Sequence, residues 1–256
     1  MDRKCAIWFL PDGITLSKER KPLMLQSVQF CPVLTWTCAE LAEQGIERLF
    51  VVSDQGAHDL IRPYLPASAV LVNGAAHAAE LLELLRGETG EVIVLNGVIL
   101  PVGVFSGGAV YAAKASAVRK VLRDHGAFAA FPAGAEILKG FLPVGDAEEL
   151  RAAQPMCRQK ILQRHFDAGV EIMDINNTYI DPRVRIGAGT TLLPGTILRG
   201  NTVIGEDCVV GPNAMLTDCT VGDGAVVNAS QAEGADIAAG ASVGPFAHLT
   251  AGDGHR

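Results

Sequence analysis

Aromatic residues make up only 5% of this 256-residue sequence, and charged residues only 19%. So few aromatic side chains argue against a surface on which nucleic-acid bases stack. The net charge of −7, without a long basic run, argues against binding a phosphate backbone, so no nucleic-acid partner is expected. Hydrophobic residues reach 49%, which excludes a disordered chain and suits one large domain or two modest ones.

Patterns for metal sites and disulfides are also lacking. The cysteines are scattered, with no CxxC pair and no Cys/His ligand spacing: Cys5, Cys31, Cys38, Cys157, Cys208 and Cys219. Buried thiols in a reducing cytoplasm are the expected state, and no metal site is expected from them.

A membrane segment is not expected either. Residues 92–113 carry no charge over a length that could cross a bilayer. Asn96, Gly97, Pro101 and the following glycines divide this stretch into short pieces, which predicts buried strands joined by turns. The apolar run at residues 5–10 is too short for a signal peptide. We therefore expect a soluble, cytoplasmic protein.

The part before Asn176 alternates two kinds of pattern, which predicts a parallel sheet with helices on both faces. The expected strands are residues 5–10, 48–53 and 91–95, and the expected helices are residues 33–44 and 77–86. A further helix is expected over residues 147–166, interrupted near Pro155 and ended by Gly169.

Beyond Asn176, aliphatic residues recur at six-residue steps, with slips at Val221 and Ala232. The series is Ile180, Ile186, Leu192, Leu198, Ile204, Val210, Leu216, Val221, Val227, Ala232, Ile237, Val243 and Leu249. Neither a helix nor a hairpin has this period, whereas a solenoid of hexapeptide repeats does. Each unit is a short strand and a turn, with the aliphatic residue inward, small residues beside it, and Gly, Asn or Asp at the corners. About twelve units predict roughly four coils.

Three stretches in the second half carry a resemblance: GVEIMDINNTYIDP, LPGTILRGNTVIGEDCVVGPN and ASVGPFAHL. They resemble the bacterial bifunctional N-acetylglucosamine-1-phosphate uridylyltransferase/glucosamine-1-phosphate acetyltransferase family, which makes the cell-wall precursor UDP-N-acetylglucosamine. The resemblance is strong from Gly169 onward. It implies an α/β chain with a Rossmann-like nucleotidyltransferase domain and a left-handed parallel β-helix. The expected boundaries are residues 1–146 for the first, 147–176 for a linker helix, and 177–256 for the β-helix.

The phosphate-binding loop departs from that family. The family opens with L-A-A-G-x-G-T-R-M and x-S-x-x-P-K, whose glycines, arginine and lysine hold nucleotide phosphates. Laid over residues 9–23, the motif keeps Thr15 and Pro22. The glycines fall on Asp12 and Ile14, the arginine on Leu16 and the lysine on Leu23. Lys18, Arg20 and Lys21 lie nearby and leave compensation open, although an exposed cationic turn is the simpler interpretation.

The metal and sugar contacts of the family are changed as well. Its L-Y-G-D carries an Mg²⁺ ligand, but here Gly97 is followed by Val98, and its V-N-D-R asparagine falls on Gly145. Neither side chain offers the oxygen ligand that Mg²⁺ needs. The family's G-T-x-H-A corresponds to Gly74 and the next four residues, where the threonine is Ala75. The resemblance leaves Thr15, Lys18, Gly74 and Gly97 as remnants of a nucleotide site, with no catalytic or metal-binding residue expected.

The acetyltransferase part is short in the same comparison. The family has an arginine after A-H-L, whereas Thr250 follows Leu249 here, and no lysine occurs after Lys160. Without an orienting carboxylate or further coils, His248 is not expected to act as a base. His58, His125 and His165 are expected to be solvated or satisfied in the core.

Three functions remain open. The first is a non-catalytic scaffold or regulatory subunit that trimerises through the β-helix, where residues 192–211 match the family best, or that joins a full-length family enzyme. The second is an active uridylyltransferase that needs Mg²⁺, and otherwise no cofactor is expected. The third is a sensor that retains a UDP-sugar.

Overall fold

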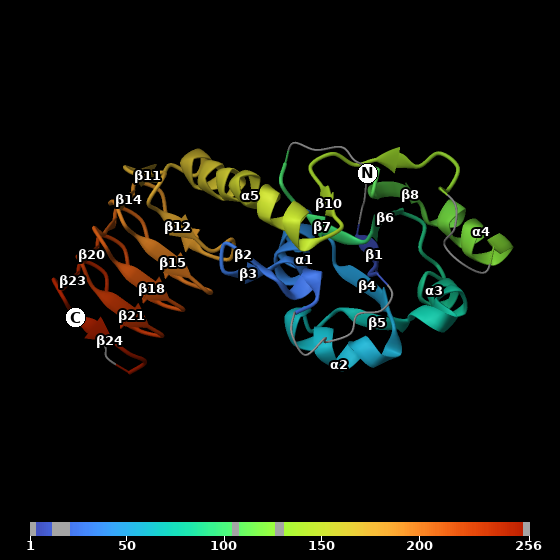
Figure 1. The fold of residues 1–256 in the computed structure, drawn as a ribbon, viewed down its shortest axis with the longest axis horizontal. Coiled ribbons are helices and arrows are strands. Elements are labelled where there is room, and N and C mark those ends of the chain that lie inside the picture. Colours follow the sequence, from blue (N-terminus) through green and yellow to red (C-terminus); the bar gives the residue numbers. More distant parts are fainter. Residues whose placement is uncertain (1–3, 12–20, 104–107, 126–130, 253–256) are drawn as a thin grey trace. The chain divides into compact units, whose positions relative to one another are not determined.

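The computed structural model describes residues 4–11, 21–103, 108–125 and 131–252, which form two compact units (Figure 1). Unit 1 comprises Met1–Ser27 and Pro32–Ala153, and unit 2 comprises Val28–Cys31 and Gln154–Arg256. The chain therefore contributes a short early segment to unit 2. Within the described residues, no helix is both long and apolar enough to span a membrane.

Unit 1 is built on a six-stranded sheet. Its order is β5 (Val70–Asn73), β4 (Arg48–Ser53), β1 (Cys5–Phe9), β6 (Glu91–Asn96), β8 (Val110–Lys114) and β9 (Glu136–Ile137). The first four strands are parallel, and β8 and β9 run antiparallel to their neighbours. A further antiparallel pair is β7 (Val98–Leu100) with β10 (Leu142–Val144). A small sheet of β2 (Ser27–Val28) and β3 (Cys31–Pro32) lies where the chain passes from unit 1 into unit 2 and back. The three expected strands are confirmed within one residue at either end.

Helices cover both faces of this sheet, as expected. Ile7 and its neighbour Phe50 pack in one core with Leu81 of α3 (His77–Leu84) and Val118 of α4 (Ala115–His125). The alternate residues of the strands face the other way. There Leu49 lines the same cavity as α1 (Val33–Glu43). The shorter helices are α2 (His58–Ile61) and the 3₁₀ turns Leu23–Leu25, Gln55–Ala57, Arg62–Tyr64 and Gly74–Ala76.

The long helix α5 (Ala147–Asp167) differs from expectation, because it continues through Pro155. Proline removes the hydrogen bond to the carbonyl of Arg151. Both residues are exposed, so water can satisfy that carbonyl, while buried residues on either side hold the helix in place: Leu150, Ala153, Cys157 and Ile161. Gly169 follows the helix with φ +83°, which confirms the expected stop.

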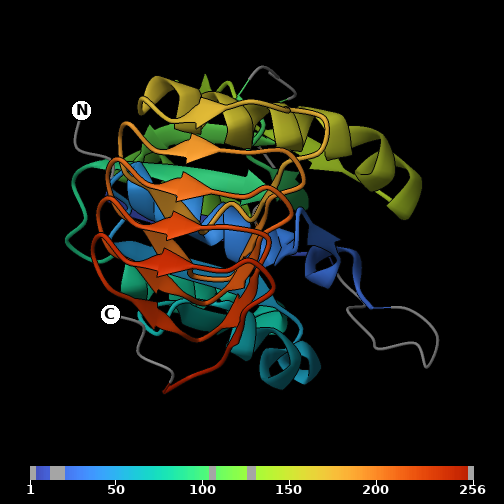
Figure 2. The same cartoon turned by 90° about the vertical axis from the view of Figure 1, so that its left-hand side faces the viewer.

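Unit 2 contains a parallel β-helix whose strands form three sheets, seen as stacked coils in Figure 2. Face 1 contains β11 (Glu171–Ile172), β14 (Thr191–Leu192), β17 (Val209–Val210), β20 (Val226–Val227) and β23 (Ser242–Val243). Face 2 contains β12 (Tyr179–Ile180), β15 (Ile197–Arg199), β18 (Met215–Thr217), β21 (Gln231–Glu233) and β24 (His248–Leu249). Face 3 contains β13 (Arg185–Ile186), β16 (Val203–Ile204), β19 (Thr220–Val221) and β22 (Asp236–Ile237).

The six-residue aliphatic series lies inside this β-helix, as expected. On face 1, for example, Leu192 pairs with Val210 and Val227 pairs with Val243. The slips at Val221 and Ala232 leave the strands in register, because Val221 still pairs with Ile204 and Ala232 with Leu216. The coil therefore absorbs changes of length at its corners.

A second inward row lies two residues before each aliphatic residue. Its members are small or β-branched and mostly buried: Thr178, Val184, Thr190, Thr196, Thr202, Cys208, Ala214, Cys219, Ala225, Ser230, Ala235 and Ala241. Thr196 Oγ1, for instance, donates to the carbonyls of Leu193 at 2.7 Å and Val210 at 3.1 Å. This row explains the low aromatic content, since no large ring fits between stacked coils.

The corners use left-handed backbone. Gly189, Gly195, Asp207 and Asn213 all have positive φ, between 53° and 81°. Gly187 needs to be glycine for another reason, because a Cβ there would lie 2.6 Å from backbone atoms of the next coil. The prediction that Gly, Asn and Asp shape the corners is confirmed.

The C-terminal part of α5 lies against the first coil. Arg164 Nη2 donates to the carbonyls of Pro182 at 2.9 Å and Val184 at 3.1 Å. Ile161 and His165 are buried on the same helix. A solenoid needs such a cover over its terminal coil, and α5 provides it.

Candidate functional site

The carboxyl ends of β1, β4, β5 and β6 meet at one edge of the unit 1 sheet, because these strands are parallel and adjacent. Open α/β sheets bind ligands at this edge. Gly74 directly follows β5 and Gly97 directly follows β6. Two of the four residues that the resemblance singles out therefore lie at the edge where such sheets bind ligands.

Gly97 makes a tight turn. Its φ is +88°, its N–H donates to the Phe9 carbonyl at 2.8 Å, and its own carbonyl accepts from Trp8 Nε1 at 2.8 Å. These bonds tie the end of β6 to β1. Gly97 thus has a clear structural role, whether or not a ligand binds.

Gly74 opens the turn that leads into α3. Asn73 Oδ1 accepts from the Ala75 N–H at 3.0 Å, and the Gly74 carbonyl lies 2.6 Å from His77 Nδ1. A Cβ on Gly74 would lie 3.4 Å from the Ser53 carbonyl, which is a tight but tolerable approach. Ala75 is exposed and offers no hydroxyl group where the resembling family has threonine.

Two buried polar atoms at this edge were not anticipated from the sequence. Ser53 Oγ and His77 Nε2 are both buried without a hydrogen-bond partner. His77 meets the Phe9 ring edge-on, with 5.6 Å between ring centroids. Unpaired buried polar atoms are costly and often mark a place where a ligand or water completes the bonding. In the sequence, the signal for this pair of atoms was a serine at the end of a buried strand.

The positions of the family's magnesium ligands do not suit a metal. Val98 is 3% exposed and pairs with Val144 in the small β7–β10 sheet. Gly145 has no side chain, and its N–H donates to Glu149 Oε2 at 2.7 Å. Asp146 Oδ1 accepts the N–H groups of residues 148 and 149 at 2.8 and 2.9 Å, so it caps α5.

The residues around these two positions do not suit a metal ion either. Asn96 is the exposed polar residue at the end of β6, and its side chain hydrogen-bonds Tyr111. Nowhere in the described ranges do three or more His, Cys, Asp or Glu side chains gather in a way that could hold a metal ion. The residues present therefore do not fit the Mg²⁺ that uridylyl transfer would use.

The other expected residues fall partly outside the described ranges. Thr15 and Lys18, with Asp12, Ile14, Leu16 and Arg20, lie outside the described residues. Lys21 is exposed, and the half-buried Leu23 begins a 3₁₀ turn. The structure therefore places Gly74 and Gly97 at a common edge and leaves the phosphate loop as a prediction.

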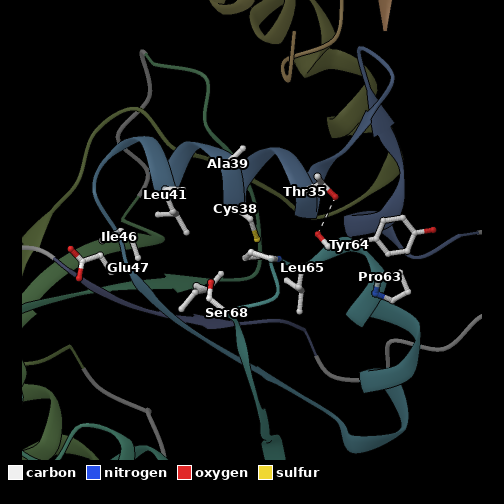
Figure 3. Close-up of a pocket in the computed structure, with 13 residues that line it drawn as sticks. Thr35, Cys38, Ala39, Leu41, Ile46, Glu47, Pro63, Tyr64, Leu65 and Ser68 are labelled. Carbon is white, nitrogen blue, oxygen red and sulfur yellow. Dashed lines mark hydrogen bonds between the residues drawn. The ribbon is translucent and has the colours of Figure 1, made fainter. Parts of the chain in front are cut away.

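A cavity of about 320 Å³ lies elsewhere in unit 1 (Figure 3). Cys38 and Leu41 of α1 line one side, and Leu65 with its neighbouring prolines lines the other. Thr35 Oγ1 donates to the Tyr64 carbonyl at 3.0 Å across it. Its strand residue is Leu49, near the start of β4, whereas the candidate site lies where β4 ends. The cavity is therefore separate from the carboxyl edge of the sheet.

The histidines and thiols behave as structural groups. His165 is 3% exposed, and its burial, with a smaller contribution from Arg164, lowers its pKa to about 4. His58 and His248 lie at least partly in solvent, and His125 is exposed. All six cysteines are free and buried, as expected.

Part of the chain matches known proteins. Residues 183–218 match the model of the bacterial transferase hexapeptide (six repeats). The chain is 50% identical over 109 residues to the bifunctional protein GlmU of Nocardia farcinica, an alignment that covers 43% of this chain and 22% of that protein. It is 42% identical over 106 residues to GlmU of a Geobacillus strain, covering 41% of this chain and 23% of that protein.

A longer alignment has lower identity. GlmU of Thermoanaerobacter pseudethanolicus is 38% identical over 131 residues, covering 51% of this chain and 28% of that protein. The matched part thus spans about a quarter of the length of these relatives. Over about half of its own length, this chain is similar to the bifunctional GlmU proteins, and residues 183–218 match the hexapeptide-repeat model.

Proposed function

We propose that the protein is a non-catalytic relative of the bifunctional GlmU proteins, acting as a scaffold or as a sugar-nucleotide-sensing subunit. One observation carries the proposal. The two positions that the resemblance assigns to magnesium ligands are the buried Val98 and Gly145, which has no side chain. Phosphoryl-type transfer depends on such groups to neutralise the charge that develops on the phosphates.

The proposal includes an assembly and a location. The β-helix would join copies into a homotrimer, or join the chain to a full-length GlmU protein, because the hexapeptide part is where the resemblance is strongest. The domain boundaries at residues 146 and 176 belong to the proposal too, as does a cytoplasmic location. The free, buried thiols support that location.

The test is pyrophosphate release from UTP and N-acetylglucosamine-1-phosphate with Mg²⁺, with a bifunctional GlmU protein as the positive control. We expect no release above background at high protein concentration. Sustained, protein-dependent release would overturn the proposal. It would instead establish the second candidate, an active uridylyltransferase that uses Lys18 or Arg20 on the phosphates.

Scaffold and sensor are separated by calorimetry with UDP-N-acetylglucosamine. The unpaired Ser53 Oγ and His77 Nε2 at the sheet edge favour a retained ligand. Saturable heat that disappears in Ser53→Ala with His77→Phe would support the sensor. An absence of heat would leave the scaffold.

A further inference from the structure

Unit 2 contains a groove of about 570 Å³ that the proposed function does not use. One wall is the part of α5 from Gln154 to Phe166, and the other is the loop at Ile175 and Asn176 before β12. The short early segment of unit 2 adds Gln29 to the lining. The volume falls in the range of small-molecule sites, about 300–1,000 Å³. We call this hollow the α5 groove.

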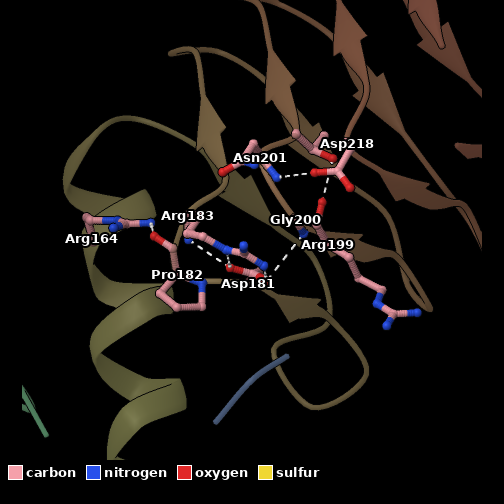
Figure 4. Close-up of polar contacts among 9 residues, drawn as sticks. Arg164, Asp181, Pro182, Arg183, Arg199, Gly200, Asn201 and Asp218 are labelled. Carbon is pink, nitrogen blue, oxygen red and sulfur yellow. Dashed lines mark hydrogen bonds and ion pairs between the residues drawn. The ribbon is translucent and has the colours of Figure 1, made fainter. Parts of the chain in front are cut away.

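Hydrogen bonds hold both walls of the α5 groove in place. Arg164 Nη2 donates to the Pro182 carbonyl at 2.9 Å and joins α5 to the first coil (Figure 4). In the loop wall, Asp174 Oδ1 accepts from the Asn176 N–H at 2.9 Å. Walls that are fixed before a ligand arrives reduce the entropy lost on binding. The groove therefore has the order that a binding site needs.

Amide side chains make up most of the polar lining of the groove. They are Gln29, Gln154, Gln159, Gln163 and Asn176. An amide has one acceptor oxygen and two donor hydrogens, so it can bind two neighbouring groups of which one donates and the other accepts. Adjacent hydroxyl groups meet this need, because each hydroxyl can both donate and accept. Such a lining favours a ligand with several hydroxyl groups.

Apolar side chains lie among these amides. Leu162 is buried, whereas Phe166 and Ile175 are 40% and 48% exposed. Leu162 and Phe166 are four residues apart, so they lie on the same stripe of α5. A sugar ring has hydroxyl groups at its edge and C–H groups on its faces, and the negative face of an aromatic ring attracts such C–H groups. The mixture of amides and an exposed ring thus matches both parts of a sugar.

Arg158 is the one charged residue among the described residues that line the groove. Its Nη2 donates to the carbonyls of Ile175 and Thr178, and its guanidinium lies 4.7 Å from the centre of the Tyr179 ring. Its Nε is buried without a hydrogen-bond partner. A buried donor of this kind often marks a place where a ligand or water completes the bonding. A hydroxyl or ring oxygen of a sugar would supply the acceptor.

Other classes of ligand fit the groove less well. A purely apolar molecule would take water from the amides without replacing their hydrogen bonds. A phosphate ester would meet only Arg158, which already donates to two carbonyls. A metal ion would find no carboxylate among the described lining residues.

From these observations we infer that the α5 groove binds a neutral carbohydrate. Phe166 packs against a face of a sugar ring, Gln159 and the neighbouring amides bind hydroxyl groups, and Arg158 Nε donates to an acceptor oxygen. All the described lining residues belong to unit 2, so this site is separate from the sheet edge of unit 1. The inference goes beyond the proposed function, because neither a scaffold nor a sensor at the sheet edge requires this second site.

The test is a saturation-transfer NMR titration of the full chain with cellobiose, maltose and lactose. We expect at least one of them to bind with a dissociation constant of about 1 mM. Gln159→Ala should weaken this binding about fivefold, because one hydrogen-bonding amide is lost. Gln231→Ala is the matched control, since Gln231 is an exposed glutamine of the same unit that lies on β21, outside the groove. It should leave the affinity unchanged.

Variants of Phe166 separate contact from folding. Phe166→Ala should weaken binding about tenfold, whereas Phe166→Tyr keeps the ring and should stay within about twofold of the wild type. Thermal midpoints without sugar show whether α5 still packs in each variant.

Three outcomes would overturn the inference. The first is no saturable binding of any of the three sugars up to about 50 mM. The second is an equal loss of affinity in Gln159→Ala and Gln231→Ala. The third is tighter binding of adenosine or of an uncharged alanine tripeptide, which would assign the groove to a base or a peptide. Because the pyrophosphate assay reports on unit 1, its outcome is independent of all three.

Discussion

The two units differ in how their residues are divided between building the fold and forming a binding site. In unit 1, the core residues lie within the strands, such as Ile7 and Val94, while ligand-binding positions lie after them. The core therefore does not depend on which residues stand at positions 98 and 145, where the resemblance implies polar ligands in the family. At this edge, Gly97 hydrogen-bonds Phe9 and Trp8, and the turn at Gly74 is held by Asn73 and His77.

In unit 2, about half of the residues in each six-residue repeat have a structural task. One residue fills the aliphatic row, another fills the small row two positions earlier, and a third makes the corner. A substitution at one of these positions can affect the next coil, as the 2.6 Å approach at Gly187 shows. This explains why the hexapeptide pattern is matched by a family model over residues 183–218.

The sharpest test of this contrast restores a metal ligand to unit 1. Val98→Asp should lower the free energy of unfolding by about 4 kcal/mol, because the new carboxylate is buried without a partner. Urea unfolding measures the change, and the pyrophosphate assay should stay at background. Asn96→Asp, on an exposed residue of the same edge, should change stability by less than about 0.5 kcal/mol. A stable Val98→Asp variant that releases pyrophosphate would contradict both expectations, the cost of burying the carboxylate and the absence of activity.

The second test is the pH dependence of unit 2. Burial lowers the pKa of His165 from its usual 6.5 to about 4, so the folded state holds it neutral. Between those values the unfolded chain binds more protons. Stability is therefore complete above pH 6.5 and falls as the pH drops to 4, by about 3 kcal/mol in all. Urea unfolding at pH 7 and pH 4.5 measures the loss.

The control for this test is His165→Leu, which removes the titrating group but keeps an apolar side chain. Its stability should depend less on pH across the same interval, although other groups still titrate. An unchanged slope in this variant would remove His165 as the cause.

The smallest expected changes in stability come from replacing one glycine in each unit. Gly187→Ala should cost about 2 kcal/mol, because its Cβ meets backbone of the next coil, which cannot move alone. In Gly97→Ala the new Cβ would meet no atom within 4 Å. Holding an alanine at a φ of +88° should still lower the free energy of unfolding by about 1 kcal/mol. Thermal unfolding of the two variants ranks them. The reverse order would show that the coil corners are softer than the sheet edge.

Local pattern predicted most of the architecture. The buried strand at residues 48–53 and the six-residue series could be identified because strand and coil periods are written directly in the residue types. The prediction of an interruption at Pro155 was wrong, because whether a proline interrupts a helix depends on the tertiary packing on either side of it. The burial of Val98 and the unpaired atoms of Ser53 and His77 depend on distant residues. No sequence period reports such contacts.

The shortening of the coils has a mechanical consequence. From Leu192 to Val210 one turn of the coil takes eighteen residues, and from Val227 to Val243 it takes sixteen, yet both pairs stay in register. Because rungs are spaced by about 4.8 Å, the five strands of face 1 measure out roughly 19 Å whatever the corners contain. The length of the β-helix along its axis is therefore fixed by the number of coils. Backbone hydrogen bonds set the spacing between strands, and inserted or deleted corner residues leave that spacing unchanged.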